Sequence, residues 1–301
     1  MNDPILPPPL PTGPMPFSRL LDEAMRLMRR NFRAIYPAVA IPLALISGAT
    51  GVLQALWFQR LVDEIGADEP PMFSVETIVM AVIGGFVLAV GMVALQKAAM
   101  DVTAGHPVDM KESWKFAIQL PVLGTVILQG LAIIGSALAC VLPVLYVAPL
   151  LSLVGPVMVA ERIFGPKAMS RSAELTRYNP HNRFSETPLV KALGLMVVTV
   201  AISYAVAMVV TLPFQIPMYI DIFRQAAAGE EPAMGTMAKW IWLQIPGQIL
   251  QMLASVAVYT YAAFGYALLF FDARNRKEGS DLAAEINTVF GPGTPAGEPA
   301  P

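Results

Sequence analysis

Residues 116–160 read FAIQLPVLGTVILQGLAIIGSALACVLPVLYVAPLLSLVGPVMVA and contain no Lys, Arg, Asp or Glu. As one helix they would measure about 67 Å, roughly twice the hydrocarbon thickness of a bilayer. The stretch therefore predicts two membrane-spanning helices joined by a tight hairpin around Leu142-Pro143. The residues that follow, ERIFGPKAMSRSAELTRYNPHNR (161–183), are rich in cations and predict a loop at one membrane surface.

The composition of the whole chain agrees with a membrane protein. Hydrophobic residues make up 55% and charged residues 14%, with a mean hydropathy of +0.58, whereas soluble domains carry about 25% charged residues. The apolar runs predict an all-α, polytopic protein with six transmembrane helices. Their expected ranges are about 34–58, 77–98, 118–141, 144–161, 191–213 and 240–270. The last run exceeds one span and is expected to tilt, or to bend near Pro246-Gly247.

The cations predict the orientation of these helices. Only Arg60, Arg224 and Lys239 fall in loops on one side of the predicted spans, so 17 of the 20 Lys and Arg residues fall on the other. Cytoplasmic loops carry the excess of Lys and Arg. We therefore expect a multi-pass protein of the bacterial cytoplasmic (inner) membrane with both termini in the cytoplasm.

An amphipathic stretch precedes each pair of spans, at 17–32, 108–118 and 166–178. The simplest interpretation is three transmembrane hairpins, each preceded by a cytoplasmic interface helix. The alternative is that any loop re-entering a membrane has an amphipathic sequence. We expect a disordered, Pro-rich N-terminal tail over 1–16, a transmembrane domain over 17–271, and a cytoplasmic tail over 272–301 that is disordered from about 291.

Three segments resemble a known family: FSRLLDEAMRLMRRNF (17–32), ERIFGPKAMSRSAELTR (161–177) and FFDARNRKEGSDL (270–282). They are similar to the bacterial six-helix membrane superfamily that includes the glycerophosphoryl diester phosphodiesterase membrane domain. The resemblance covers 17–282. Its fourth-loop pattern matches Glu161, Gly165, Ala168, Arg171 and Ser172, and its tail pattern matches Asp272, Arg274, Arg276, Glu278, Gly279, Asp281 and Leu282. A catalytic phosphodiesterase barrel needs about 250 residues, so the resemblance implies the membrane part without the catalyst.

The sequence offers little for catalysis or metal binding. His106 and His181 have no second His or Cys at ligand spacing, and Cys140 stands alone in an apolar run. No phosphate-binding loop, dinucleotide fingerprint or nucleophile elbow occurs. We therefore expect no enzyme activity, no cofactor, no metal and no nucleic-acid partner.

Polar and small residues inside the spans allow two interpretations. Gln244, Gln248, Gln251 and Ser255 share one face of the sixth helix. This polar seam either lines a substrate path or makes hydrogen bonds between helices, and we favour the second. Glycines inside the spans, namely Gly84, Gly85 and Gly130, are expected to allow close helix packing.

Charged residues beside the membrane are the remaining site candidates. Arg29 and Arg30 precede the first span, where they either contact anionic head groups or only set the topology. Arg171 is expected to pair with Glu161, Glu174 or a carboxylate of the tail. In the tail, Asp272 and Arg274 are further candidates for salt bridges or head-group contacts.

The function that follows is a non-enzymatic integral membrane protein. It would act as a scaffold or a lipid-associated accessory component, with membrane lipids or another membrane protein as its partner. The alternative is a transporter or lipid-handling protein with a cavity between the helical hairpins.

Overall fold

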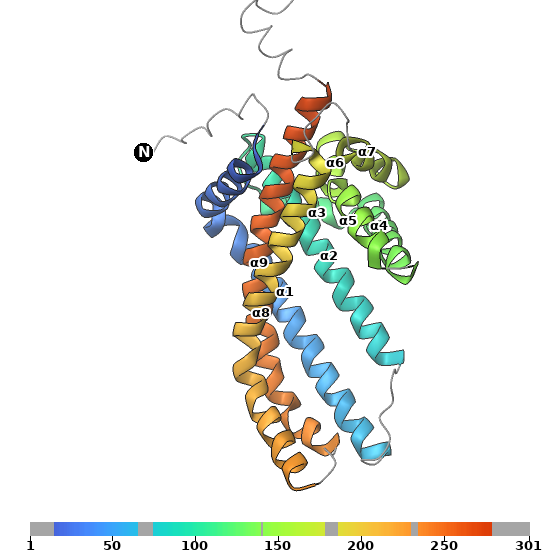
Figure 1. Ribbon diagram of the computed structural model, residues 1–301, viewed down its shortest axis with the longest axis vertical. Helices are drawn as coiled ribbons and strands as arrows, with labels where there is room; N and C mark the ends of the chain where they lie inside the picture. The colour runs from blue at the N-terminus through green and yellow to red at the C-terminus, as the bar shows by residue number, and fades with distance from the viewer. Residues whose placement is uncertain (1–14, 66–74, 140, 178–185, 230–233, 279–301) are drawn as a thin grey trace, which may run out of the picture.

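The computed structural model describes residues 15–65, 75–139, 141–177, 186–229 and 234–278 (Figure 1). Within these ranges the chain forms nine α-helices and no β-strand. They are α1 (Phe17–Ile65), α2 (Val75–Thr103), α3 (Met110–Ala117), α4 (Leu120–Ala139), α5 (Val141–Leu151), α6 (Val154–Glu161), α7 (Pro166–Thr176), α8 (Pro188–Ala227) and α9 (Met234–Glu278). Six segments are long and apolar enough to cross a membrane. The predicted all-α fold with six such segments is confirmed.

The last helix, α9, is the centre of the bundle. It contacts α1, α8 and α2 along its length, and α4 to α7 lie together on one side of this group (Figure 1). In its most apolar window 72% of the residues are buried inside the protein, compared with 6% for α8. Small residues of α9, among them Ala262, Ala263 and Ala267, are almost completely buried and let the neighbouring helices approach closely.

The first helix is longer than the sequence predicted. The amphipathic stretch 17–32 does not form a separate interface helix but is continuous with the first span, in a helix of 49 residues. The helix contains Pro37 and Pro42, and its dark-blue first part runs in a different direction from the rest (Figure 1). Proline has no N–H, so Pro42 leaves the carbonyl of Ala38 without its helical donor. The indole N–H of Trp114 in α3 donates to this carbonyl at 3.2 Å.

The fourth span is interrupted. The predicted break near Leu142-Pro143 lies close to the junction of α4 and α5, but a second break separates α5 from α6 at residues 152–153. Its freed carbonyls are satisfied by other helices. The Leu150 carbonyl accepts the hydroxyl of Ser172 at 2.6 Å, and the Leu151 carbonyl accepts the Gln129 amide at 3.0 Å. The carbonyls freed at this break therefore hydrogen-bond α5 to α4 and α7.

The short helices α3 and α7 form within two of the predicted amphipathic stretches. Asp109 caps α3 by accepting the backbone N–H of Glu112 at 3.0 Å. Before α7, Gly165 has a φ of +66°, a conformation that favours glycine, and Pro166 begins the helix. Ala168, Ser172 and Leu175 are the fully buried side of α7.

Helix α9 runs through residue 272, where the cytoplasmic tail was expected to begin. Helix α9 continues without a break to Glu278, because Asp272 and Ala273 are buried in the bundle. The disordered N-terminal tail was predicted over 1–16, but Met15 is described, buried and hydrogen-bonded to Asp272. The part of that prediction that falls on 1–14, and the disorder predicted from about residue 291, lie outside the described residues.

Candidate functional site

Three clusters of charged residues lie at the end of the bundle where α9 ends, which we call the terminal end (top of Figure 1). They are the Met15 clamp (Met15, Glu186, Lys191, Asp272 and Arg276), the Arg171 cluster (Glu161, Arg171, Glu174 and Lys277), and the Lys97 cluster (Lys97, Asp101 and Glu112).

The Met15 clamp joins three distant segments. The Lys191 ammonium at the start of α8 lies 2.7 Å from the Asp272 carboxylate of α9, with side-chain exposures of 1% and 2%. The same ammonium donates to the carbonyl of Met15 at 2.5 Å, and the backbone N–H of Met15 donates to Asp272 at 2.9 Å. Arg276 donates at 3.1 Å to the Oδ1 of Asp272, which also accepts the Met15 N–H, and it lies 3.8 Å from Glu186.

The centre of the clamp is the buried ion pair between Lys191 and Asp272, whose charged groups all have hydrogen-bond partners. A buried charge is costly unless it is paired and its remaining hydrogen-bonding groups are occupied. Asp272 accepts from Met15, Lys191 and Arg276, and Lys191 has two acceptors. The backbone just before α1 is one of the partners, so the clamp fixes where the first helix begins.

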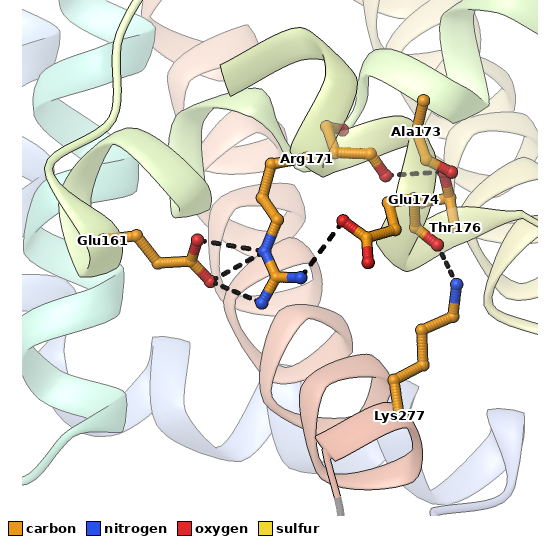
Figure 2. A network of polar contacts seen from close by, with 7 residues as sticks. Glu161, Arg171, Ala173, Glu174, Thr176 and Lys277 are labelled. Carbon is orange, nitrogen blue, oxygen red and sulfur yellow. Dashed lines mark hydrogen bonds and ion pairs between the residues drawn. The ribbon is translucent and has the colours of Figure 1, made fainter. Parts of the chain in front are cut away.

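The Arg171 cluster connects α6, α7 and α9 (Figure 2). The guanidinium of Arg171 lies between two carboxylates, 3.0 Å from Glu161 and 3.3 Å from Glu174. It contacts Glu161 through both Nε and Nη2, the paired geometry that binds a carboxylate best. From α9, the Lys277 ammonium donates to the backbone carbonyl of Glu174. Lys277 thus joins the end of α9 to α7.

The Arg171–Glu161 pair is expected to contribute measurably to stability. Its side chains are 21% and 14% exposed, so the coupling free energy between Arg171→Gln and Glu161→Gln should be about 1 kcal/mol, near the upper limit for exposed pairs. Unfolding of the two single variants and the double variant in mixed micelles measures it. Glu174 is 64% exposed, so the same cycle between Arg171 and Glu174 is the control and should give a smaller coupling. Equal couplings would contradict this assignment.

The Lys97 cluster links α2 to α3. Lys97 is almost completely buried and lies 2.5 Å from Asp101 one turn later, and 3.8 Å from the exposed Glu112 of α3. Lys97 falls at the end of the span predicted over 77–98. In the structure it is inside α2, where its stem packs in the core and its ammonium reaches the terminal end.

The structure separates the site candidates chosen from the sequence. Arg171 and Glu161 are brought together. Asp272 pairs with Lys191 and Arg276 of the clamp. Arg29 and Arg30 are exposed on the first part of α1 and are not members of the three clusters. The sequence analysis did not predict the roles of Lys191 and Met15, because no local sequence pattern identifies their partners.

The polar seam of α9 (Gln244, Gln248, Gln251 and Ser255) faces α1 at Gln248. A Cβ placed on Gly51 of α1 would be 2.6 Å from the Gln248 side-chain oxygen. Ser255, at the end of the seam, is 8% exposed. The contact at Gln248 favours the interpretation that the seam belongs to helix packing.

A cavity of about 270 Å³ opens between α1, α2 and α9. Polar side chains of α1 line one wall, Gly84 and Gly85 of α2 line the other, and the polar residues are Ser47, Thr50 and Gln54. Gln248 and Gln251 are not among the lining residues. A Cβ on Gly84, Gly85 or Gly130 would meet nothing within 4 Å. The expectation that these glycines pack closely against another helix is therefore wrong; the first two border the cavity.

The arrangement shows which chemistry the described residues can support. The buried carboxylates are engaged by cations, and no group of three or more His, Cys, Asp or Glu residues gathers in the described ranges at metal-binding distance. The charges of the three clusters join helices to one another. Comparison of the chain with protein-family models, with curated proteins and with solved structures finds no match in any of the three.

Proposed function

We propose that this chain is a multi-pass protein of the bacterial cytoplasmic membrane with a non-enzymatic role, as a scaffold or a lipid-associated accessory component. In this proposal the six apolar segments form three hairpins, the terminal end faces the cytoplasm, and the first part of α1, α3 and α7 lie at the membrane surface. The relationship to the membrane superfamily that includes the glycerophosphoryl diester phosphodiesterase membrane domain is part of the same proposal.

The observation that carries the scaffold role is the use of the buried charges. Lys191, Asp272 and Lys97 are nearly inaccessible, and each is paired with a group on the same chain. A catalytic acid or base, or a coupling carboxylate in a transporter, needs access to a substrate or ion. These pairs instead stabilise the terminal end, while only 6% of the apolar window of α8 is buried, which leaves exposed side chains there for lipid or for another membrane protein.

Site-specific photocrosslinking from α8 tests this role. Val200 and Val209 are 61% and 73% exposed, so a photoreactive residue at either position reports what covers the helix in the native membrane. We expect a discrete adduct with one membrane protein, absent when the label is placed at the buried Leu195. Adducts with lipid alone from both positions would contradict the scaffold role and leave the lipid-associated one.

The cavity between α1 and α2 favours a second candidate, a lipid-handling protein. The polar wall of this cavity would offer hydrogen-bonding groups to a lipid head group that crosses the apolar interior of the membrane. Transfer of a fluorescent phospholipid between leaflets of proteoliposomes distinguishes the two functions. The scaffold predicts a rate equal to that of empty vesicles. A faster rate that Gly85→Leu abolishes, by filling the cavity, would establish the second candidate instead.

A further inference from the structure

The first part of α1 has an exposed cationic side. Five arginines, which we call the arginine row, are all exposed, and at 3.6 residues per turn they occupy a sector of about 100°. They are Arg19, Arg26, Arg29, Arg30 and Arg33. Asp22 is the exposed carboxylate of this sector, and Glu23 at its border pairs with Arg26 at 2.5 Å. The row therefore keeps a clear excess of positive charge.

The orientation of the row is fixed by the rest of the protein. Leu20, Ala24 and Leu27, on the opposite side of the helix, are buried in the core of the bundle. The backbone immediately before α1 is held by the Met15 clamp. The helix cannot rotate without exposing this apolar face, so the arginines must point away from the bundle.

An apolar strip lies beside the arginine row. Leu21, Met25 and Phe32 fall between the row and the buried face; Met25 is 36% exposed, and the other two are partly exposed. Arg33 is also the last charged residue before the uncharged run 34–59 of the same helix. The row is thus placed at the level where the apolar surface of the protein begins.

We propose that the arginine row is a binding surface for the phosphate groups of anionic phospholipids, with Leu21, Met25 and Phe32 in contact with the acyl chains. This inference rests on the proposed membrane location of the terminal end. Guanidinium groups bind phosphate oxygens in pairs, and an adjacent apolar strip distinguishes a lipid from a soluble anion. The fixed orientation of α1 presents several guanidinium groups at once.

Lipid titration onto the purified full chain in neutral detergent tests the proposal. Fluorescent phosphatidylglycerol and phosphatidylcholine with the same acyl chains are compared. We expect phosphatidylglycerol to bind at least about tenfold more tightly, and added salt to weaken it. The triple variant Arg26→Gln/Arg29→Gln/Arg33→Gln should remove this preference. Inorganic phosphate should not displace the lipid; displacement would identify a soluble anion as the ligand and overturn the proposal.

A matched control removes the same charge elsewhere at the terminal end. Lys111, Lys115 and Lys167 are exposed on α3 and α7, and their triple Gln variant should keep the preference for phosphatidylglycerol. If both triple variants lose the preference for phosphatidylglycerol equally, the lipid is attracted by total charge and not by the arginine row, which would overturn the site. An unchanged affinity of the arginine variant for phosphatidylglycerol would also overturn it. Arg29→Gln alone, expected to weaken binding about threefold, keeps the test valid if the triple variant does not fold.

The proposed cytoplasmic location of the terminal end and the proposed lipid site can be tested independently. Reporter fusions at the N-terminus and after Glu278 give the orientation in cells, whereas lipid binding in detergent does not depend on orientation. A periplasmic N-terminus with intact lipid preference would overturn the proposed location. A cytoplasmic N-terminus without lipid preference would overturn only the arginine row.

Discussion

Replacing Asp272 by Asn is expected to lower the free energy of unfolding by about 3–5 kcal/mol, because it leaves the Lys191 charge buried without its counter-ion. Both side chains are almost inaccessible, at 2% and 1% exposure, so water cannot replace the lost interaction. The loss should be visible as a lower midpoint when the protein is unfolded in detergent by added SDS. Asp272 also accepts the Met15 N–H and Arg276, and an amide oxygen is a weaker acceptor than a carboxylate, so these two contacts are weakened as well.

Asp221→Asn is the matched control for this prediction. Asp221 also joins α8 to α9, at the opposite end of the two helices, where it accepts the Trp240 indole at 2.8 Å and the exposed Lys239 at 3.2 Å. Its replacement should leave stability close to that of the wild type. Replacing both partners, in Lys191→Met/Asp272→Leu, should recover much of the loss by removing the unpaired charge. If Asp272→Asn is no more harmful than Asp221→Asn, the clamp is not a major source of stability.

Gly265→Ala is expected to cost about 1–3 kcal/mol of unfolding free energy by overpacking the contact between α8 and α9. A Cβ at Gly265 would lie 2.7 Å and 2.9 Å from the two terminal carbons of Leu195. Leu195 is fully buried, so its side chain has to shift within the packed core to make room for the new methyl group. The same SDS titration measures the loss.

Gly85→Ala is the control for the packing prediction. A Cβ there meets nothing within 4 Å, and alanine favours the helix by up to about 1 kcal/mol, so stability should stay constant or rise. In the Gly265→Ala background, Leu195→Val should restore part of the stability by freeing space. A Gly265→Ala variant as stable as Gly85→Ala would contradict the tight contact.

The sequence predicted more of the fold than of the site. Long apolar runs identify membrane-length helices directly, and the Gly165-Pro166 turn, which is local, brings Arg171 within reach of Glu161. Gly84 and Gly85 were misinterpreted because a glycine in an apolar helix has the same sequence pattern whether it faces another helix or a cavity. At the interruption between α5 and α6, the partners of the freed carbonyls, Gln129 and Ser172, come from other helices and follow only from the tertiary structure.

The sequence alone therefore determined the helical class, the number of apolar helices and the uneven distribution of charge. These properties depend on composition and on residues that are neighbours along the chain. The tertiary structure alone decided that α9 is central, that Trp114 caps the Ala38 carbonyl, and that Lys191 meets Asp272 and Met15. The physical reason is that a helix's rotation and neighbours are set by the packing of all helices together, and Met15 and Asp272 are 257 residues apart.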